Sequence, residues 1–305
     1  MKMENKEKYH IPVLLNDSVD MLIGNPSGIY VDVTFGGGGH SAEILNRLDA
    51  DAKLFAFDQD ADAKNNLLDD KRFVFVPQNF AYVKNNLRLH RGLPVDGLLA
   101  DLGVSSHQFD TAERGFSTRF DGELDMRMNQ KSDLTAKIVV NEYDEMELFR
   151  LLKTYGELKN ARSVASRIVY RRGSEQLLTI EELKSALVSL APRNKHAQFF
   201  AKVFQAIRIE VNQEMEVLKM LLNQLDSVIA VGGKIVFITY HSLEDRMVKN
   251  YINSGNVNGE LEKDFYGNIL KPFKKITRKP IVPSEDELVL NPRSRSAKMR
   301  VAERI

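Results

Sequence analysis

Residues 30–40 of this 305-residue chain read Tyr30-Val31-Asp32-Val33-Thr34-Phe35-Gly36-Gly37-Gly38-Gly39-His40. A short β-type run passes directly into four glycines, and helix-compatible residues follow from Ser41. Because glycine has no Cβ, the backbone can turn tightly there, and its N–H groups can approach a ligand at the positive end of the following helix dipole. The stretch predicts a strand, a turn and a helix that together bind a cofactor.

A carboxylate follows the second predicted strand. Residues 53–58 end in Asp58, at about the 20-residue spacing at which an acid commonly holds a nucleotide ribose. Nicotinamide dinucleotides and S-adenosylmethionine both present such a ribose. Ser41 stands where the G-x-G-x-x-G dinucleotide pattern places its third glycine, which favours S-adenosylmethionine. The alternative is that the glycines form a flexible loop without a ligand.

The composition permits a large core and excludes cysteine chemistry. Hydrophobic residues make up 43% of the chain, which is long enough for one large or two ordinary domains. The absence of cysteine excludes disulfides, thiolate nucleophiles and zinc–cysteine sites. The charged start, residues 1–8, does not resemble a secretory signal, and no apolar run is long enough to span a bilayer. We expect a cytoplasmic protein without a metal site.

Short β-type runs alternate with helix-compatible stretches over the first hundred residues. The runs lie at 28–33, 53–58, 72–76 and 95–102. This alternation predicts an α/β fold, Rossmann-like, with a mostly parallel, doubly wound sheet. Ligands of such sheets bind beyond the carboxyl ends of the strands, which directs attention to Asp58, Phe80 and Asp101. Phe80 alone would more commonly be a core residue.

A helical pattern then interrupts the sheet. The alternation stops after Ser106, residues 144–210 show helical periodicity, and an amphipathic segment over 211–229 extends it. Another strand follows at 234–239, so the sheet resumes. We predict an all-helical domain inserted into a two-part α/β domain. The predicted boundaries are 1–108, 109–210 and 211–305.

Charge is unevenly distributed although the net charge is only +1. Residues 156–210 hold ten Lys or Arg against five Glu, and residues 271–300 hold nine against three acids. Such patches can neutralise phosphates, as nucleic-acid-binding surfaces do. The alternative is an ordinary solvated helix face.

Two polar segments lie near the end of the chain. Residues 240–246 read Tyr240-His241-Ser242-Leu243-Glu244-Asp245-Arg246 and follow the resumed strand, where ligands bind. Alone, His241 would more commonly have a structural role. Residues 291–305 combine a basic loop, a candidate contact for RNA or phosphate, with a final strand that would close the sheet.

The chain resembles the bacterial RsmH or MraW family from end to end. Members use S-adenosylmethionine to methylate N4 of a cytosine in the decoding region of 16S ribosomal RNA, cytosine 1402 in the usual rRNA numbering. The motifs that carry the resemblance are His10-Ile11-Pro12-Val13-Leu14-Leu15, Thr34-Phe35-Gly36-Gly37-Gly38-Gly39-His40-Ser41, Phe57-Asp58-Gln59-Asp60, Asp101-Leu102-Gly103-Val104-Ser105-Ser106, Glu113-Arg114-Gly115-Phe116-Ser117, Leu124-Asp125-Met126-Arg127-Met128, Phe204-Gln205-Ala206-Ile207-Arg208-Ile209, His241-Ser242-Leu243-Glu244-Asp245-Arg246 and Asn291-Pro292-Arg293-Ser294-Arg295-Ser296.

The resemblance implies a class I methyltransferase fold, in which residues 1–108 and 211–305 form the methyltransferase domain and the inserted helical domain over 109–210 recognises the substrate. It also implies S-adenosyl-L-methionine as cofactor. The implied partner is 16S rRNA within the small ribosomal subunit, bound by a monomer or homodimer. The implied cofactor-binding residues are Gly38, Gly39 and His40 for the methionine part, Asp58 for the ribose, Phe80 for the adenine, and Asp101 and Gln108 for the rest of the pocket. The chain departs from the family pattern at two places: Glu123 stands where the family commonly has proline, and Thr239-Tyr240 stands where it has a Ser-Phe pair. We expect neither to touch a cofactor position.

The expected chemistry requires a hydrogen-bond acceptor. An exocyclic cytosine amine is a poor nucleophile because its lone pair is delocalised into the ring. Relatives that methylate amino nitrogens use a D/N/S-P-P-Y/F segment after the fourth strand, where this chain has Asp101 and no prolines. We hypothesise that Asp101, or a neighbouring carbonyl, accepts from N4 and that His241 and Ser242 orient the base. Alternatively, Asp101 serves only the cofactor. The arginines predicted to bind RNA phosphates are Arg167, Arg171, Arg172, Arg293 and Arg295.

Two other functions compete with this one. The first is a nicotinamide-dependent oxidoreductase on the same sheet, which lacks the third motif glycine. The second is an RNA-binding or assembly factor that retains a decayed cofactor fold. The intact Gly38, Gly39, Asp58 and Asp101 argue against such decay.

Overall fold

The computed structural model describes residues 12–305. The expectations for residues 1–8 and the motif residues His10 and Ile11 lie outside this range. Two compact units make up the chain: residues up to Gly103 together with Val217–Ile305, and Val104–Glu216. The domain boundaries predicted at 108/109 and 210/211 stand as a proposal beside these units.

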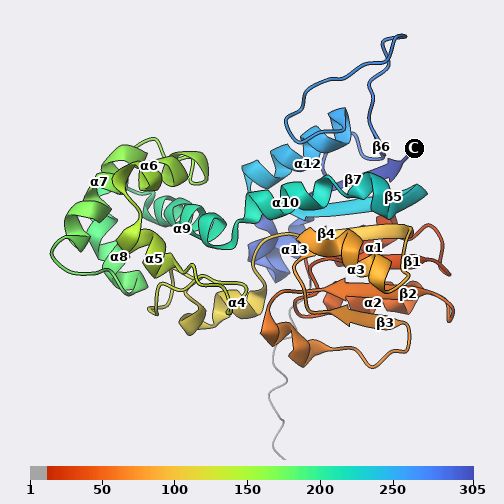
Figure 1. The fold of residues 1–305 in the computed structure, drawn as a ribbon. Coiled ribbons are helices and arrows are strands. Elements are labelled where there is room, and N and C mark those ends of the chain that lie inside the picture. Colours follow the sequence, from red (N-terminus) through yellow and green to blue (C-terminus); the bar gives the residue numbers. More distant parts are fainter. Residues whose placement is uncertain (1–11) are drawn as a thin grey trace, which may run out of the picture. The chain divides into compact units, whose positions relative to one another are not determined.

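The first unit is built on a sheet that, within residues 12–305, has seven strands in the order β3-β2-β1-β4-β5-β7-β6 (Figure 1). The strands are β1 (Ile29–Asp32), β2 (Lys53–Phe57), β3 (Phe73–Val76), β4 (Val95–Asp101), β5 (Ile229–Thr239), β6 (Phe273–Lys275) and β7 (Lys298–Arg304). Neighbouring strands from β3 to β5 are parallel, whereas β7 is antiparallel to both β5 and β6. The segments that follow β1, β2 and β4 therefore leave the sheet at one edge.

Helices cover both faces of this sheet. The helices of the first unit are α1 (Leu15–Leu22), α2 (Gly39–Arg47), α3 (Val83–Leu89), α11 (Leu225–Val228), α12 (Ser242–Ser254) and α13 (Glu285–Leu290), with α10 (Glu214–Leu222) crossing the division between units. Leu22 of α1 and Ile44 of α2 pack with Tyr30 on one face. Leu87 of α3 and Val248 of α12 pack with alternate strand residues on the other. Burial on both faces explains why the strands read as nearly continuous apolar runs.

The predicted strands are present, but one predicted helix is wrong. The amphipathic segment over 211–229 is not continuous, because Gln213 takes a left-handed conformation (φ 50°) and ends the preceding helix. Shorter helices, α10 and α11, follow it. Strand β5 also begins at Ile229, earlier than predicted, because the chain passes through Gly232-Gly233 as an irregularity within the strand. The apolar spacing alone did not reveal these backbone breaks.

The second unit is helical and has its own core. Its helices are α4 (Ser106–Asp110), α5 (Ala136–Glu142), α6 (Glu145–Thr154), α7 (Ala161–Arg172), α8 (Ile180–Leu187) and α9 (His196–Asn212). Buried Leu148, Val164 and Leu183 from successive helices share one apolar cluster. Thr179 and Glu182 form a capping box at the start of α8. Among residues 12–305, no helix combines the length and apolar character needed to cross a membrane.

Candidate cofactor and substrate site

The glycine run forms the turn between β1 and α2. Gly36 and Gly38 have positive φ values of 49° and 78°, and Gly38 is the N-cap of α2. A Cβ on Gly39 would lie 2.3 Å from Pro12 Cγ, whereas one on Gly37 would meet nothing within 4 Å. Three of the four glycines are therefore required by backbone conformation or close packing, and a flexible loop is not what the structure shows.

Asp58 fixes this turn to the end of β2. Its Oδ2 accepts a hydrogen bond from the Gly36 N–H at 2.7 Å, and its Oδ1 accepts one from the Asp60 N–H at 2.8 Å. Burial raises the pKa of the Asp58 carboxyl to about 6, against the lowering effect of these two bonds. Each carboxylate oxygen can accept a further bond, so ribose hydroxyls remain suitable partners. The structure brings together the glycine turn and the acid that the sequence paired.

Asp32 is an acid to which the sequence analysis gave no role. It ends β1 and is fully buried, and its Oδ2 accepts from the Ser41 hydroxyl at 2.7 Å while Oδ1 accepts from the Thr34 N–H. Thr34 Oγ1 in turn accepts from the Asp101 N–H at 2.7 Å. These bonds connect the ends of β1 and β4 to the start of α2. The sequence did contain a signal for Asp32, because a carboxylate stands there inside an apolar strand shortly before the four glycines.

Asp101 lies at the carboxyl end of β4 between two side chains. Tyr240 donates its hydroxyl hydrogen to Asp101 Oδ1 at 2.8 Å, and His40 Nδ1 lies 3.8 Å from Oδ2. Tyr240 therefore contacts Asp101, one of the predicted cofactor residues, which contradicts the expectation that Tyr240 touches none of them. Strand β5 runs parallel to β4 beside it, which sets Tyr240, the residue after β5, next to Asp101.

Opposing effects set the pKa of Asp101, and burial acts on the neighbouring His40 ring as well. Burial raises the pKa of the Asp101 carboxyl to about 6, and nearby Asp32 and Glu244 add to this, while His40 and the Tyr240 hydrogen bond lower it. Burial lowers the pKa of the His40 ring. Its Nε2 lies 3.2 Å from the Val13 carbonyl, which can only accept, so Nε2 carries the hydrogen and Nδ1 is an acceptor in the neutral ring.

His241 is the N-cap of α12. Its Nδ1 accepts from the Glu244 N–H at 3.4 Å, and its Nε2 lies 3.1 Å from Glu244 Oε1. Buried Glu244, which the sequence analysis also left without a role, accepts from the Tyr240 N–H at 3.0 Å. Ser242 is the exposed first residue of α12. That His241 and Ser242 orient the base stays a prediction.

The two remaining predicted cofactor residues lie in different units. Phe80 begins a short 3₁₀ helix after β3, is partly buried, and packs against the core under α3 and α12. Gln108 belongs to the second unit, where its side-chain oxygen accepts from the Ser105 N–H at 3.0 Å and completes the capping box of α4. Their contacts with a cofactor stay predictions.

The predicted RNA-binding arginines differ in their exposure and in whether their guanidinium groups form hydrogen bonds within the protein. On α7, Arg171 is exposed, whereas Arg172 donates to the Val140 and Tyr143 carbonyls at 2.7 and 2.6 Å. Arg167 Nη1 donates to Ser189 at 3.3 Å. Arg293 is partly buried and Arg295 exposed. Both lie in a short 3₁₀ helix over Pro292–Ser296 that leads into β7.

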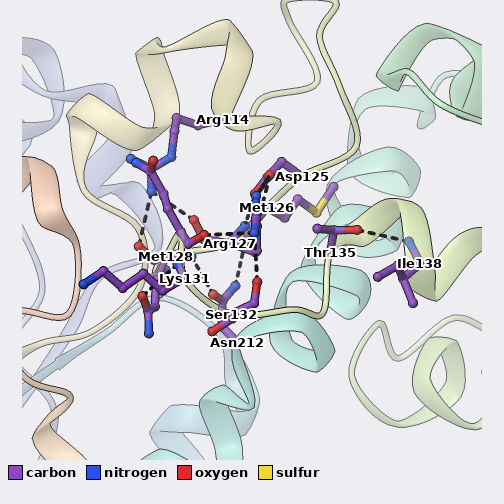
Figure 2. Close-up of polar contacts among 12 residues, drawn as sticks. Arg114, Asp125, Met126, Arg127, Met128, Lys131, Ser132, Thr135, Ile138 and Asn212 are labelled. Atoms are coloured by element: carbon purple, nitrogen blue, oxygen red, sulfur yellow. Dashed lines mark hydrogen bonds and ion pairs between the residues drawn. The ribbon is translucent and has the colours of Figure 1, made fainter.

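A segment of the second unit is held by a polar network (Figure 2). Arg127 contacts both carboxylate oxygens of Asp125, and Arg114 donates to the Arg127 carbonyl at 2.9 Å. At the end of α9, Asn212 donates to the Met126 carbonyl and accepts from the Met128 N–H, both at 2.7 Å. The motif residues at 113–117 and 124–128 therefore fix the shape of a segment that lacks regular structure.

These features define a class of protein. A parallel sheet extended by one antiparallel strand, a glycine turn after β1 and acids after β2 and β4 are those of a Rossmann-like class I methyltransferase.

The comparison with known proteins assigns the family within this class. The chain matches the model of the MraW methylase family over residues 7–305 and belongs to that family. Proteins named ribosomal RNA small subunit methyltransferase H from Phocaeicola vulgatus and Flavobacterium johnsoniae are each 55% identical to it, over 99% of this chain and 99% and 100% of their own lengths. A solved rRNA methylase from Streptococcus thermophilus is similar, with a TM-score of 0.38, 12% identity and 99% of both chains covered. The family that matches is one of methylases rather than of nicotinamide-dependent oxidoreductases.

Proposed function

We propose that this chain uses S-adenosylmethionine to methylate N4 of a cytosine in the decoding region of 16S rRNA, in the small ribosomal subunit. The observation that carries this proposal is full-length membership in a methylase family, with relatives at 55% identity whose names specify small-subunit ribosomal RNA. The choice of the cytosine amine rests on the family resemblance and on the chemistry of Asp101.

The residues of the first unit fit the proposed cofactor. The turn is so close-packed at Gly38 and Gly39 that side chains there would meet Phe35 and Pro12, and Asp58 retains acceptor capacity for ribose hydroxyls. S-adenosylmethionine supplies a methyl group on a positively charged sulfur that leaves as a neutral thioether. The chain then has to position the amine in line and to manage one proton.

Asp101 is the proposed acceptor for the cytosine amine. A carboxylate that accepts an N4–H hydrogen bond concentrates the lone pair on nitrogen and so makes the amine a better nucleophile. Tyr240 fixes the carboxyl group through Oδ1, and Oδ2, which lies 3.8 Å from His40 Nδ1, is the proposed acceptor for the amine. Such orientation matters because methyl transfer depends on geometry more than on activation of the leaving group.

Methylation of an amine releases a proton, and the Asp101–His40 pair can take it. With the His40 Nε2–H directed to the Val13 carbonyl, Nδ1 presents a lone pair toward Asp101. One proton can then reside on Asp101 Oδ2 or on His40 Nδ1, so the two groups titrate as a pair. A pKa of about 6 for Asp101 leaves it mostly ionised at neutral pH and still able to accept a proton transiently.

Transfer of labelled methyl from S-adenosylmethionine to small-subunit RNA tests this function. We expect the unsubstituted chain to label the RNA and Asp58→Asn to need a higher cofactor concentration, because a neutral amide is a weaker acceptor for ribose hydroxyls. Lack of labelling on both free RNA and assembled subunits would exclude the proposal.

A further inference from the structure

A cavity of about 100 Å³ lies outside the candidate site, on the face of the sheet covered by α12. It is formed by α12, by β6 and the residues after it, and by β7, which Figure 1 shows side by side at the end of the sheet. The lining residues are Lys249, Ile252, Asn253, Lys275, Thr277, Arg278, Arg300 and Val301.

The lining is strongly cationic. Four of the eight lining residues carry a positive charge, and none is an acid. Arg300 is neutralised by Asp245, which it contacts through two nitrogens at 2.7 and 3.1 Å. Within residues 12–305, the side chains of Lys249, Lys275 and Arg278 form no hydrogen bond or ion pair, and all three are exposed.

Three uncompensated cations around one small cavity repel one another unless an anion joins them. A cavity of about 100 Å³ has room for several water molecules or for one phosphate group. The Thr277 hydroxyl and the Asn253 amide add neutral donors to this lining. Size, charge and donors together fit a phosphate group.

The cavity is connected to the end of β5, where the proposed reaction takes place, through the pairing of β7 with β5. Arg300 of β7 pairs with Phe237 of β5, two residues before Thr239, which pairs with Lys298. Tyr240 follows directly and donates to Asp101. A polyanion whose base reached Asp101 would have backbone phosphates within reach of this part of the surface.

We propose that the cavity lined by Lys249, Lys275 and Arg278 binds one phosphate group of the RNA backbone. The identity of the phosphate as part of an RNA rests on the proposed function. The same chemistry would also suit the phosphate of a free nucleotide or inorganic phosphate, and the experiment separates these sources.

The test measures binding of a small-subunit RNA fragment to the full chain at several salt concentrations. For Lys275→Ala with Arg278→Ala we expect about a tenfold loss of affinity at low salt, because charge-assisted bonds are lost. The slope of log affinity against log salt should fall by about 0.7, the value for one contact with single-stranded nucleic acid. S-adenosylmethionine affinity, and methyl transfer at saturating RNA, should stay unchanged.

Lys274→Ala is the matched control. Lys274 is the exposed neighbour of Lys275 on β6, and alternation along a strand turns its side chain to the other face, outside the cavity. An equal loss of RNA affinity in Lys274→Ala would show that the RNA is attracted by the general positive charge of this surface, and it would overturn the proposed phosphate site. Unchanged RNA binding by the double variant, with inorganic phosphate or a mononucleotide bound at the cavity, would overturn the RNA assignment. Failure of the proposed function is separate, because it would show as absent methyl transfer by the unsubstituted chain.

Discussion

At the scale of single residues, Asp101 combines a raised pKa, which suits a proton acceptor, with a hydrogen bond from Tyr240 that fixes its orientation. Burial and the nearby Asp32 and Glu244 raise its pKa, and His40 and Tyr240 lower it, so that the value is about 6. The ionised form that the proposed mechanism needs is thus lost as the pH falls through about 6.

Tyr240→Phe tests this balance. Removing the hydroxyl removes one of the effects that lower the pKa of Asp101, so we expect the acid limb of the rate profile to move to higher pH by about one unit. Single-turnover methyl transfer measured from about pH 5 to 9 gives the profile. A limb that stays in place or moves to lower pH would show that Tyr240 does not act through Asp101.

Asp101→Asn separates chemistry from stability. We expect methyl transfer at saturating S-adenosylmethionine to fall by at least about 100-fold. Because the folded-state pKa of about 6 lies above the ordinary 3.8, ionisation costs folding free energy as the pH rises from about 4 to 6. The variant should therefore be more stable at pH 8, by at most about 3 kcal/mol, and only about half of this advantage should remain at pH 5.

Thermal unfolding at pH 5 and pH 8 supplies the second readout for Asp101→Asn. A wild-type transfer rate would remove Asp101 from the chemical step. Equal stability of the two proteins at both pH values would instead contradict the cost assigned to the buried carboxylate.

The sequence predicted which acids follow strands, but not what each one contacts. Asp58 and Asp101 were found because strand ends of a parallel sheet meet at one edge. Asp32 and Glu244 were missed because their roles depend on hydrogen bonds to Ser41 and Tyr240 that only the packed backbone creates. Arg172 was predicted to bind phosphate, yet its guanidinium is used by two carbonyls of its own unit, which a basic pattern cannot show.

At the scale of elements, the glycine turn and the segment over 113–135 are both shaped by specific contacts. The turn was predictable, because few residues other than glycine adopt its left-handed positions. The segment was not, because its shape depends on Asn212, which is distant in sequence.

Gly39→Ala and Gly37→Ala form a matched pair. The first places a Cβ 2.3 Å from Pro12 Cγ and must displace the start of α2, whereas the second meets open space. We expect Gly39→Ala to weaken S-adenosylmethionine binding by at least about tenfold in a calorimetric titration, and Gly37→Ala to leave folding stability unchanged. Similar affinity in Gly39→Ala and the unsubstituted chain would contradict the close packing assigned to the turn.

Asn212→Ala probes the segment in Figure 2. The substitution leaves the Met126 carbonyl and the Met128 N–H without their side-chain partner, at a cost of about 2–3 kcal/mol. Asn212→Asp keeps the acceptor for Met128 but turns a carboxylate oxygen toward the Met126 carbonyl in place of the amide donor, so it should destabilise the segment as well. Hydrogen exchange over residues 124–132 measures the loosening, and unchanged exchange in Asn212→Ala would rule out this role.

At the scale of the whole molecule, both units offer exposed cations to a polyanionic substrate. Arg171 and Arg295 are exposed, whereas Arg172 supports the second unit internally. We expect Arg171→Ala to lower the salt dependence of RNA binding and Arg172→Ala mainly to lower the melting temperature. Salt titrations together with thermal unfolding distinguish them. The reverse pattern would show that Arg172 is the RNA contact.

The most direct measurement of the central claim maps the modified nucleotide. Small subunits from a strain that lacks this activity would be incubated with the protein and labelled S-adenosylmethionine, and the RNA digested and analysed by mass spectrometry. The account predicts one labelled nucleoside, N4-methylated cytidine from the decoding region of 16S rRNA, and none with Asp101→Asn. Label on a ring carbon, on another base or outside this region would contradict it.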